Sequence, residues 1–248
     1  MITTLILGQS DVVSLLAQAG AKTEDAKLYA APLLETAHSY HIETPLRFSH
    51  WLAQLMHESG DLKYTEELAS GAAYEGRKDL GNTRPGDGKR FKGRGLIQLT
   101  GRANVTRYGR YRNDPRLVDE PERLARLPLS VDSAGWFWCF GTTQNLNHIA
   151  DKDNVTLITR LINGGLNGLR ERQRLLTLIE RLMDEIGTFK VQKALNSLSV
   201  YPTVTEDGVM GQRTISVLKE LQSDYLFPTY HGDVDTKTWE ILKWRVKT

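Results

Sequence analysis

The sequence contains one cysteine, little net charge and no long apolar run, and each scarcity excludes a class of protein. With Cys139 alone among 248 residues, no intramolecular disulfide can form, which suits folding in a reducing cytoplasm. The formal net charge of +2 is too small for a protein whose main partner is nucleic acid. No apolar run approaches the roughly 18 residues of a membrane span, so we expect no stable membrane association.

The N-terminal segment "MITTLILGQSDVV" lacks the basic residues and the apolar length of a secretory signal peptide. We therefore expect the protein to be made in the cytoplasm without a signal peptide. If its substrate lies outside the membrane, another component must let the protein through.

Most of the sequence has the periodicity of α-helices. Hydrophobic residues make up 40% of the chain and charged residues 25%, which is typical of a globular protein with a substantial core. Apolar residues from Phe48 to Met56 recur at the spacing of a buried helix face. "SVDSAGWFWCFG" (130–141) is apolar nearly all round and predicts a central buried helix, while "LLTLIERLMDEIG" (175–187) predicts an amphipathic helix that ends at Gly187. The predicted fold class is mainly α.

Residues 71–95, "GAAYEGRKDLGNTRPGDGKRFKGRG", are the exception. They contain seven glycines and one proline and follow neither helical nor strand periodicity. A loop of this length in a compact domain is usually functional or disordered. Its aromatic residues, Tyr74 and Phe91, and its interspersed charges favour a functional loop.

The character of the sequence changes near residue 188. "DGVMGQRTISVL" (207–218) is echoed by "HGDVDTKTWEIL" (231–242) at a period of 24 residues, with glycines and threonines in register. Two repeats are too few for a solenoid, so we predict a small helical domain made of two loop–helix units. The predicted domains are 1–187 and 188–248, in contact with each other.

Glu58 stands out because it lies at the margin of an apolar helix face, just before Gly60. Partial burial and the negative end of the helix dipole both disfavour its charged form. A carboxyl group that holds its proton near neutral pH can act as a general acid. The alternative is a helix-end residue in an ordinary ion pair.

Glycosidase chemistry needs a second carboxylate, and Glu75 in "AYEGR" is the leading candidate. Inverting glycosidases pair a neutral carboxyl group with a charged carboxylate about 6.5–9.5 Å away, which leaves room for a water. Nearby backbone and Arg77 could hold Glu75 in its ionised form. Glu66 and Glu67 in "KYTEEL" are rival bases, although a solvated face is their simpler interpretation.

Three separated blocks, "AQLMHESG", "YEGRKDLGNTRPGDGKRFKGRGLIQLTGRAN" and "ITRLINGGLNGLRERQ", resemble glycoside hydrolase family 19. The resemblance covers roughly residues 25–185 and is greatest to the bacteriophage and prophage endolysin branch, with plant-type chitinases more distant. It implies a lysozyme-like, two-lobed, mostly helical fold and an inverting mechanism without a covalent intermediate. No metal or organic cofactor is implied, and Asp61 stands where an H-E-x-x-H zinc motif needs its second histidine.

The resemblance also implies roles for individual residues. By position, Glu58 would be the general acid, Glu75 the general base, and Thr100 the residue that helps to hold the attacking water. Asn167 lies in the loop where plant chitinases often carry a glutamate, which removes one possible ion-pair partner from the active site. The substrate-binding candidates are Gln98, Asn104, Asn163, Tyr74 and Arg94.

Residues 188–248 resemble a peptidoglycan-binding domain of the three-helix type, through "VQKALNSL", "DGVMGQRTISVLKELQ" and "GDVDTKTWEIL". The alternative is a helical extension that only stabilises the catalytic domain. The blocks together predict a monomeric endolysin that hydrolyses the β-1,4 bonds between N-acetylmuramic acid and N-acetylglucosamine in peptidoglycan. The protein would reach the cell wall after the membrane has been opened by a holin-type partner, which the resemblance alone implies. A chitinase and an inactive wall-binding protein are the alternatives.

Overall fold

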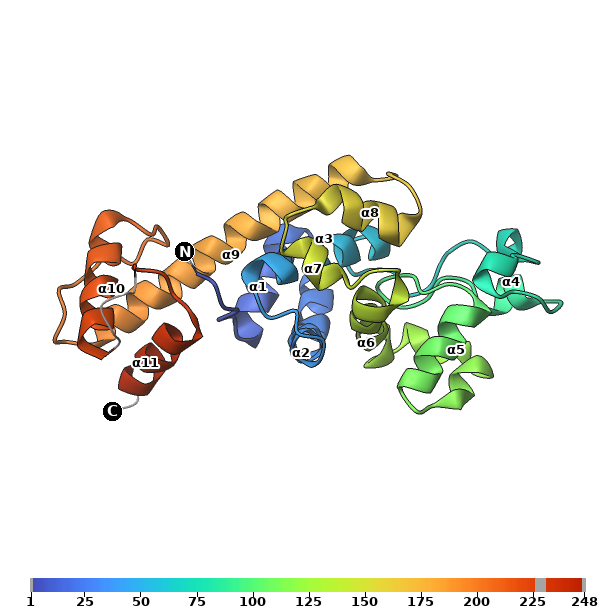
Figure 1. Cartoon of the computed structure of the whole chain (residues 1–248), viewed down its shortest axis with the longest axis horizontal. Coiled ribbons are helices and arrows are strands. Elements are labelled where there is room, and N and C mark those ends of the chain that lie inside the picture. The colour runs from blue at the N-terminus through green and yellow to red at the C-terminus, as the bar shows by residue number, and fades with distance from the viewer. Residues whose placement is uncertain (1, 226–230, 247–248) are drawn as a thin grey trace.

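The computed structural model describes residues 2–225 and 231–246, and this part of the chain is mainly helical (Figure 1). Among these residues, β-type pairing is limited to isolated bridges, such as the one between Ile2 and Val234. The predicted fold class is therefore confirmed. Within the same residues, none of the helices combines the length and the apolar character that a membrane crossing requires.

The α-helices are α1 (Gln9–Ala19), α2 (Thr23–Ser39), α3 (Pro45–Ser59), α4 (Asp87–Arg90), α5 (Arg102–Tyr111), α6 (Leu129–Trp136), α7 (Leu146–Ala150), α8 (Val155–Asn163), α9 (Leu169–Ser197), α10 (Gln212–Tyr225) and α11 (Thr236–Val246). Short 3₁₀ turns are η1 (Ala72–Tyr74), η2 (Lys78–Leu80), η3 (Pro115–Val118) and η4 (Pro121–Ala125), and η5 (Phe137–Gly141) is a π-helical turn.

Helix α3 is the centre of the N-terminal part of the molecule. It begins after its N-cap, Thr44, and ends at Gly60 in the left-handed conformation. The predicted apolar face is buried, but the polar side chains of Ser49, His50 and Gln54 are buried as well. Helix α3 is therefore enclosed on all sides, with its most extensive packing against α9.

The all-round apolar segment at 130–141 forms α6 followed by the π-helical turn η5. Trp136 and Trp138 are both buried. Gly135 allows a close approach to the end of α2, because an added Cβ atom would lie 2.4 Å from the Tyr40 ring. The prediction of a central buried helix is confirmed, with its second half wound as a π-helix.

Helix α9 is 29 residues long, and it corrects one predicted boundary. The sequence predicted a helix end at Gly187, but α9 continues to Ser197. An added Cβ atom at Gly187 would lie 2.7 Å from Cδ1 of Ile2, so this glycine serves close packing and not helix termination. Figure 1 shows α9 running from beside α8 to α10 at the opposite end of the molecule. It contributes to two hydrophobic cores, through residues such as Leu175 in the first and Val191 in the second.

The two loop–helix units predicted in the C-terminal part are present, and each contains the same kind of polar contact. Gln192 of α9 accepts hydrogen bonds from the backbone N–H groups of Asp207 and Gly208 at 3.0 and 2.9 Å. Gln222 of α10 accepts one from the Gly232 N–H at 3.0 Å and donates to the Thr238 hydroxyl at 3.0 Å. In each unit, a buried glutamine ties a glycine turn to the preceding helix.

The proposed division between residues 187 and 188 stays a prediction, because α9 crosses it without a linker. Segments on either side of the division are in contact. The amide of Thr3 donates to the Val234 carbonyl oxygen at 2.9 Å, and Nζ of Lys190 donates to the Asp11 carboxylate at 2.6 Å.

Candidate active site

Glu58 lies in the last turn of α3, with its side chain 18% exposed. The helix stops sharply because Gly60 is left-handed and because Asp61 and Leu62 also have positive φ angles. The Ser59 hydroxyl accepts a hydrogen bond from the Leu62 amide at 2.9 Å and so holds this turn. The carboxyl group therefore lies at the margin of the buried helix, where the sequence predicted it.

A buried guanidinium group that the sequence analysis did not single out holds Glu58. Arg172, near the start of α9, donates from Nη2 to Oε1 of Glu58 at 2.5 Å and from Nη1 to Oε1 of Gln54 at 2.6 Å. This contact joins the last turn of α3 to the start of α9. The structure thus contains the ion pair that was the alternative interpretation of Glu58. The role of Glu58 as general acid stays a prediction.

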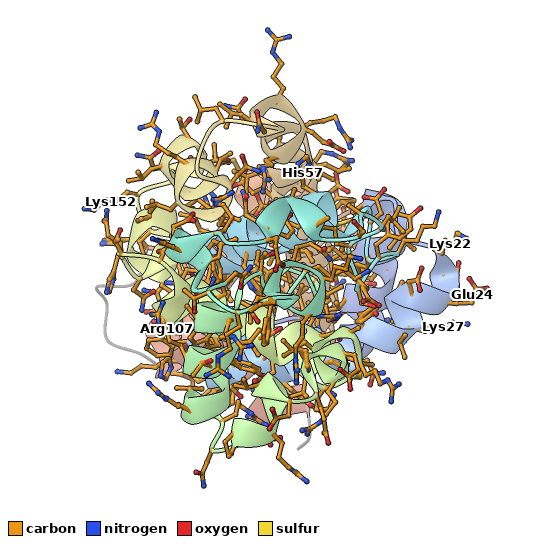
Figure 2. All side chains as sticks on the ribbon, turned by 90° about the vertical axis from the view of Figure 1, so that its right-hand side faces the viewer. Lys22, Glu24, Lys27, His57, Arg107 and Lys152 are labelled. Carbon is orange, nitrogen blue, oxygen red and sulfur yellow. The ribbon has the colours of Figure 1, made fainter. Side chains whose placement is uncertain are left out.

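The loop between α8 and α9 closes over the same helix end. Nδ1 of His57 lies 3.0 Å from Oε2 of Glu171, and in Figure 2 His57 lies below the start of α9. Gly168 has a φ of 74°, and an added Cβ atom would approach Nε2 of His57 to 2.3 Å, so only glycine fits here. The loop itself carries no acid beside Asn167, but Glu171 in the first turn of α9 lies near the helix end and pairs with His57.

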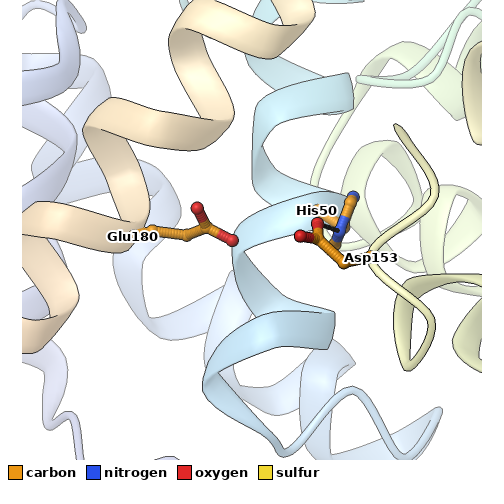
Figure 3. A group of neighbouring side chains, drawn as sticks. All are labelled: His50, Asp153 and Glu180. Carbon is orange, nitrogen blue, oxygen red and sulfur yellow. Dashed lines mark hydrogen bonds and ion pairs between the residues drawn. The ribbon is translucent and has the colours of Figure 1, made fainter. Parts of the chain in front are cut away.

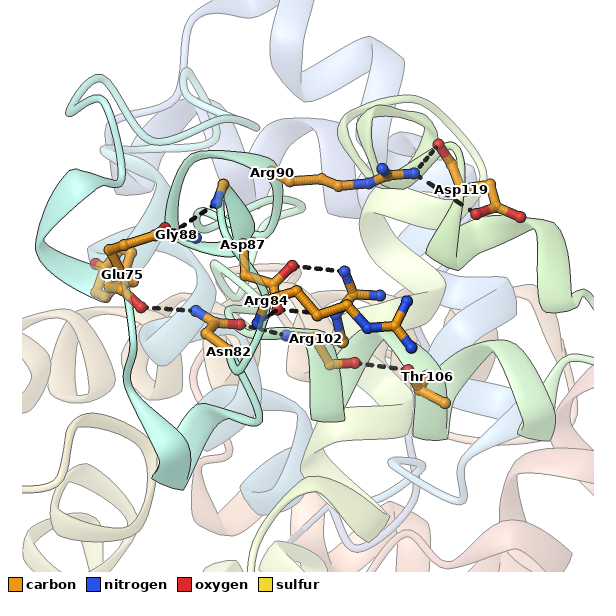
Figure 4. Close-up of polar contacts among 11 residues, drawn as sticks. Glu75, Asn82, Arg84, Asp87, Gly88, Arg90, Arg102, Thr106 and Asp119 are labelled. Atoms are coloured by element: carbon orange, nitrogen blue, oxygen red, sulfur yellow. Dashed lines mark hydrogen bonds and ion pairs between the residues drawn. The ribbon is translucent and has the colours of Figure 1, made fainter.

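The glycine-rich loop is ordered by polar contacts, as Figure 4 shows. Both oxygens of Glu75 accept backbone N–H groups, Oε1 from Gly86 and Oε2 from Gly88, each at 2.7 Å. An added Cβ atom at Gly88 would lie 2.6 Å from the Glu75 nitrogen, so the contact requires glycine. Glu75 therefore binds the tip of its own loop.

A partly buried ion pair anchors this loop to α5. Arg102 donates from Nε to Oδ2 of Asp87 at 2.9 Å and from Nη2 to Oδ1 at 2.5 Å, and this pairing holds the pKa of Asp87 below its usual range. The Asn82 side chain donates to the Tyr74 carbonyl oxygen at 3.0 Å and accepts the Arg102 amide at 2.9 Å (Figure 4). The loop is thus ordered, while its function stays a prediction.

The segment after α3 runs beside the end of the glycine-rich loop and brings Glu67 into the site. The Glu67 amide donates to the Gly93 carbonyl oxygen at 2.9 Å. Its carboxylate accepts the Tyr74 hydroxyl at Oε1, at 3.0 Å, and the Gly93 amide at Oε2, at 3.1 Å. Glu67 is therefore engaged with the loop, and Tyr74 has a carboxylate partner.

Glu66, the neighbouring rival, pairs with basic side chains. Its Oε1 lies 3.1 Å from Nη2 of Arg94 and 3.3 Å from Nζ of Lys92. Arg94 is 7% exposed and also donates from Nη1 to the Arg90 carbonyl oxygen at 2.7 Å. These contacts give Arg94 a structural task in the loop, and its contact with substrate stays a prediction.

Three further candidates lie on one short segment and are joined through its backbone. The Thr100 hydroxyl donates to the Gln98 carbonyl oxygen at 2.8 Å, and the Asn104 amide donates to the Thr100 carbonyl oxygen at 2.9 Å. The Gln98 side chain and the Glu67 carboxylate flank Gly93, where an added Cβ atom would lie 2.8 Å from Oε1 of Gln98 and 3.3 Å from Oε2 of Glu67. The structure thus brings these candidates together with Glu67.

Asn163 is the last residue of α8 and is exposed. The helix ends there because Gly164 adopts the left-handed conformation. Among the described contacts, none joins the Asn163 side chain to Glu58 or Gln98, so its role in substrate binding stays a prediction.

Comparisons with known proteins found similarities for parts of the chain. A family described as a putative peptidoglycan binding domain matches residues 188–242. A glycosyl hydrolase family 19 domain-containing protein of Haemophilus influenzae is 40% identical over 111 residues, which are 44% of this chain and 50% of that protein. Part of the chain is therefore similar to a protein with a glycoside hydrolase family 19 domain. An endochitinase of Arabidopsis thaliana is 38% identical over 121 residues, which are 48% of this chain and 40% of the relative. The chain thus spans half or less of the length of these relatives.

Solved structures show that the fold is that of family 19. The class IV chitinase from Zea mays has a TM-score of 0.55 at 20% identity, with 71% of this chain and 92% of that chain covered. Chitinase C from Streptomyces griseus has a TM-score of 0.53 at 20% identity, with 72% and 93% covered. The expected chitinase-like, mainly helical fold is confirmed, and the C-terminal residues match the expected peptidoglycan-binding family.

Proposed function

We propose that this protein is an endolysin that hydrolyses the β-1,4 bond between N-acetylmuramic acid and N-acetylglucosamine in bacterial peptidoglycan. The observation that carries the proposal is the junction of a family 19-type site and a peptidoglycan-binding domain on one continuous helix. Helix α9 contacts Glu58 through Arg172 near its start and contributes Val191 and Leu195 to the core of the C-terminal unit. Because α9 is continuous, it ties the site to the C-terminal unit. Once that unit has bound the cell wall, the glycan within reach of the site is peptidoglycan and not chitin.

Glu58 is the proposed general acid, which protonates the glycosidic oxygen as the bond to the sugar carbon breaks. Arg172 orients the carboxyl group through Oε1, and within the described residues Oε2 accepts no hydrogen bond and can face the substrate. We expect a bound glycan to exclude water from Glu58 and so to favour the protonated form that the reaction requires.

For the general base, the contacts favour Glu67 over Glu75, the residue that the family resemblance named. The Tyr64 amide donates to the Ser59 carbonyl oxygen at 2.8 Å, which ties the chain three residues before Glu67 to the neighbour of Glu58. Three extended residues span at most about 11 Å, which limits how far the backbone of Glu67 can lie from that of Ser59. An inverting pair with a carboxyl separation of about 6.5–9.5 Å is compatible with this limit. Glu75 uses both carboxylate oxygens to hold its own loop.

Thr100 and Gln98 complete the proposed site. Because the Thr100 hydroxyl donates to the Gln98 carbonyl oxygen, its lone pairs are left to accept a hydrogen bond from the attacking water. The base takes the other proton of that water as its oxygen bonds to the sugar carbon. The Gln98 amide, beside the Glu67 carboxylate, suits an acetamido group of the glycan.

A chitinase is the second candidate, because an Arabidopsis relative is named an endochitinase. Purified peptidoglycan and chitin would be digested in parallel, reduced with borohydride and analysed by mass spectrometry for the sugar at each new reducing end. Reduced N-acetylmuramic acid, with slow cleavage of chitin, is the expected result. Reduced N-acetylglucosamine from both polymers would favour the chitinase, and an absence of new ends would leave a wall-binding protein without catalysis.

A further inference from the structure

We propose that His50, Asp153 and Glu180 form a binding site for a divalent metal ion of the zinc type, separate from the proposed catalytic residues. His50 lies in the middle of α3, Asp153 in the turn between α7 and α8, and Glu180 on α9. One potential ligand atom from each residue lies within 4.8 Å of the other two. Figure 3 shows the Glu180 carboxylate directed toward the His50–Asp153 pair.

The donor set is one that zinc accepts. Imidazole nitrogen and carboxylate oxygen bind Zn²⁺ at about 2.0–2.2 Å, and three protein ligands leave a fourth tetrahedral position for water. Nε2 of His50 already lies 2.9 Å from Oδ1 of Asp153. Ligand atoms around a tetrahedral zinc are about 3.3 Å apart, so a movement of roughly 1–2 Å by the flexible Glu180 side chain would close the site.

Within the described residues, neither carboxylate of this cluster is paired with a lysine or an arginine. His50 is fully buried and Glu180 is half-buried, and within the described residues Glu180 makes no hydrogen bond or ion pair. Burial raises the pKa of Glu180, and the charges of Asp153 and Asp184 raise it further. Two carboxylates without a lysine or arginine partner beside a buried imidazole form a group that a dication would neutralise.

The cluster is accessible from solvent. Glu180 and Asp184 line a cavity of about 480 Å³ together with Asp151. Arg47, one helical turn before His50, does not neutralise the carboxylates of Asp153 and Glu180, because its guanidinium is paired with Asp151 at 2.7 Å. A hydrated metal ion can therefore reach Glu180 through this cavity.

The site is expected to act on stability and not on the reaction. His50 precedes Glu58 by eight residues on α3, which is about 12 Å along the helix axis. A bound ion would join α3 to α9, the same two helices that Glu58 and Arg172 connect. It would also link the turn that carries Asp153 to these helices. Metal binding should therefore raise thermal stability without changing which bond is cleaved.

The test uses the untagged, full-length protein after removal of metal with a chelator. Calorimetric titration with zinc chloride should give one ion per chain, and saturating zinc should raise the unfolding midpoint by about 5 °C or more, while magnesium should do neither. Glu180→Gln should weaken zinc binding by at least about tenfold and remove the rise in midpoint. The matched control, Asp184→Asn, removes another carboxylate from the same cavity and should keep the zinc site.

The proposal is overturned if the wild-type protein binds no zinc. It is also overturned if zinc stabilises Glu180→Gln as much as the wild type, because the ion would then bind elsewhere. Glutamine keeps the volume of glutamate at this half-buried position, and circular dichroism without metal would verify that the variant is folded.

Discussion

The two sides of the proposed catalytic site are held by different kinds of structure. Glu58 projects from the end of a buried helix and is oriented by one buried side chain, Arg172. Glu67 and Glu75 lie outside the α-helices, and glycine N–H groups hold their carboxylates. Helix packing therefore positions the proposed acid, whereas the backbone of the loop positions the candidate bases. Substitutions that separate these two kinds of support test the comparison.

The largest effect is expected from loss of the acid. Glu58→Gln keeps an acceptor for Arg172 but removes the proton donor, so cleavage should fall by about 10³-fold. The loss would be measured as clearing of cells stripped of their outer membrane, with sedimentation on purified walls to verify that binding is unchanged. Glu171→Gln, which alters the acid next to His57, is the matched control and should stay within about tenfold of the wild type. Near-normal activity of Glu58→Gln would remove Glu58 from the mechanism.

The next largest effect distinguishes the two candidate bases. Glu67→Gln should reduce cleavage by about 10²–10³-fold. Glu75→Gln should reduce it by only about tenfold and should also lower the unfolding midpoint, because the N–H groups of Gly86 and Gly88 lose a charged acceptor. Glu66→Gln serves as the control for a nearby paired glutamate. The opposite order of Glu67 and Glu75 would return the role of base to Glu75.

A smaller effect, on stability, is expected on the helix side. Arg172→Met would leave the Gln54 side chain buried without its partner and would remove the cation from Glu58. The free energy of unfolding should fall by about 2–3 kcal/mol in urea titrations, since one partner of a largely buried pair is lost. Arg170→Met, at an exposed position two residues earlier, should change it by less than about 0.5 kcal/mol. Equal effects at both positions would show that the buried contact contributes little.

The same difference explains how much could be predicted from the sequence. The buried helices α3 and α6 were predictable, because burial imposes the helical period on apolar residues. Arg172 carried a signal that was missed: it lies three residues before Leu175, on the buried face of α9. A fully buried arginine needs a partner, so this position pointed to an internal ion pair.

The loop side offered no such period. The choice between Glu67 and Glu75 depends on which glycine N–H groups face each carboxylate, and that follows from backbone conformation across many residues. Gly187 shows a related difficulty within a helix. A glycine that ends a helix and a glycine that permits close packing look the same in the sequence. Family resemblance supplied the chemistry of the site but not the contacts that rank its carboxylates.

The smallest effects are expected in the C-terminal unit, where the buried glutamine of the first repeat makes more hydrogen bonds than that of the second. Gln192 accepts two backbone N–H groups and Gln222 accepts one, so Gln192→Ala should cost about 2 kcal/mol of stability and Gln222→Ala about 1 kcal/mol. Thermal unfolding would measure both, with exposed Gln212→Ala as the control. Both variants should lose wall binding on heating before the cleavage of small soluble glycan fragments is lost. Simultaneous loss of cleavage in Gln192→Ala would instead mean that α9 transmits the damage to Arg172 and Glu58, and that the two parts unfold as one unit.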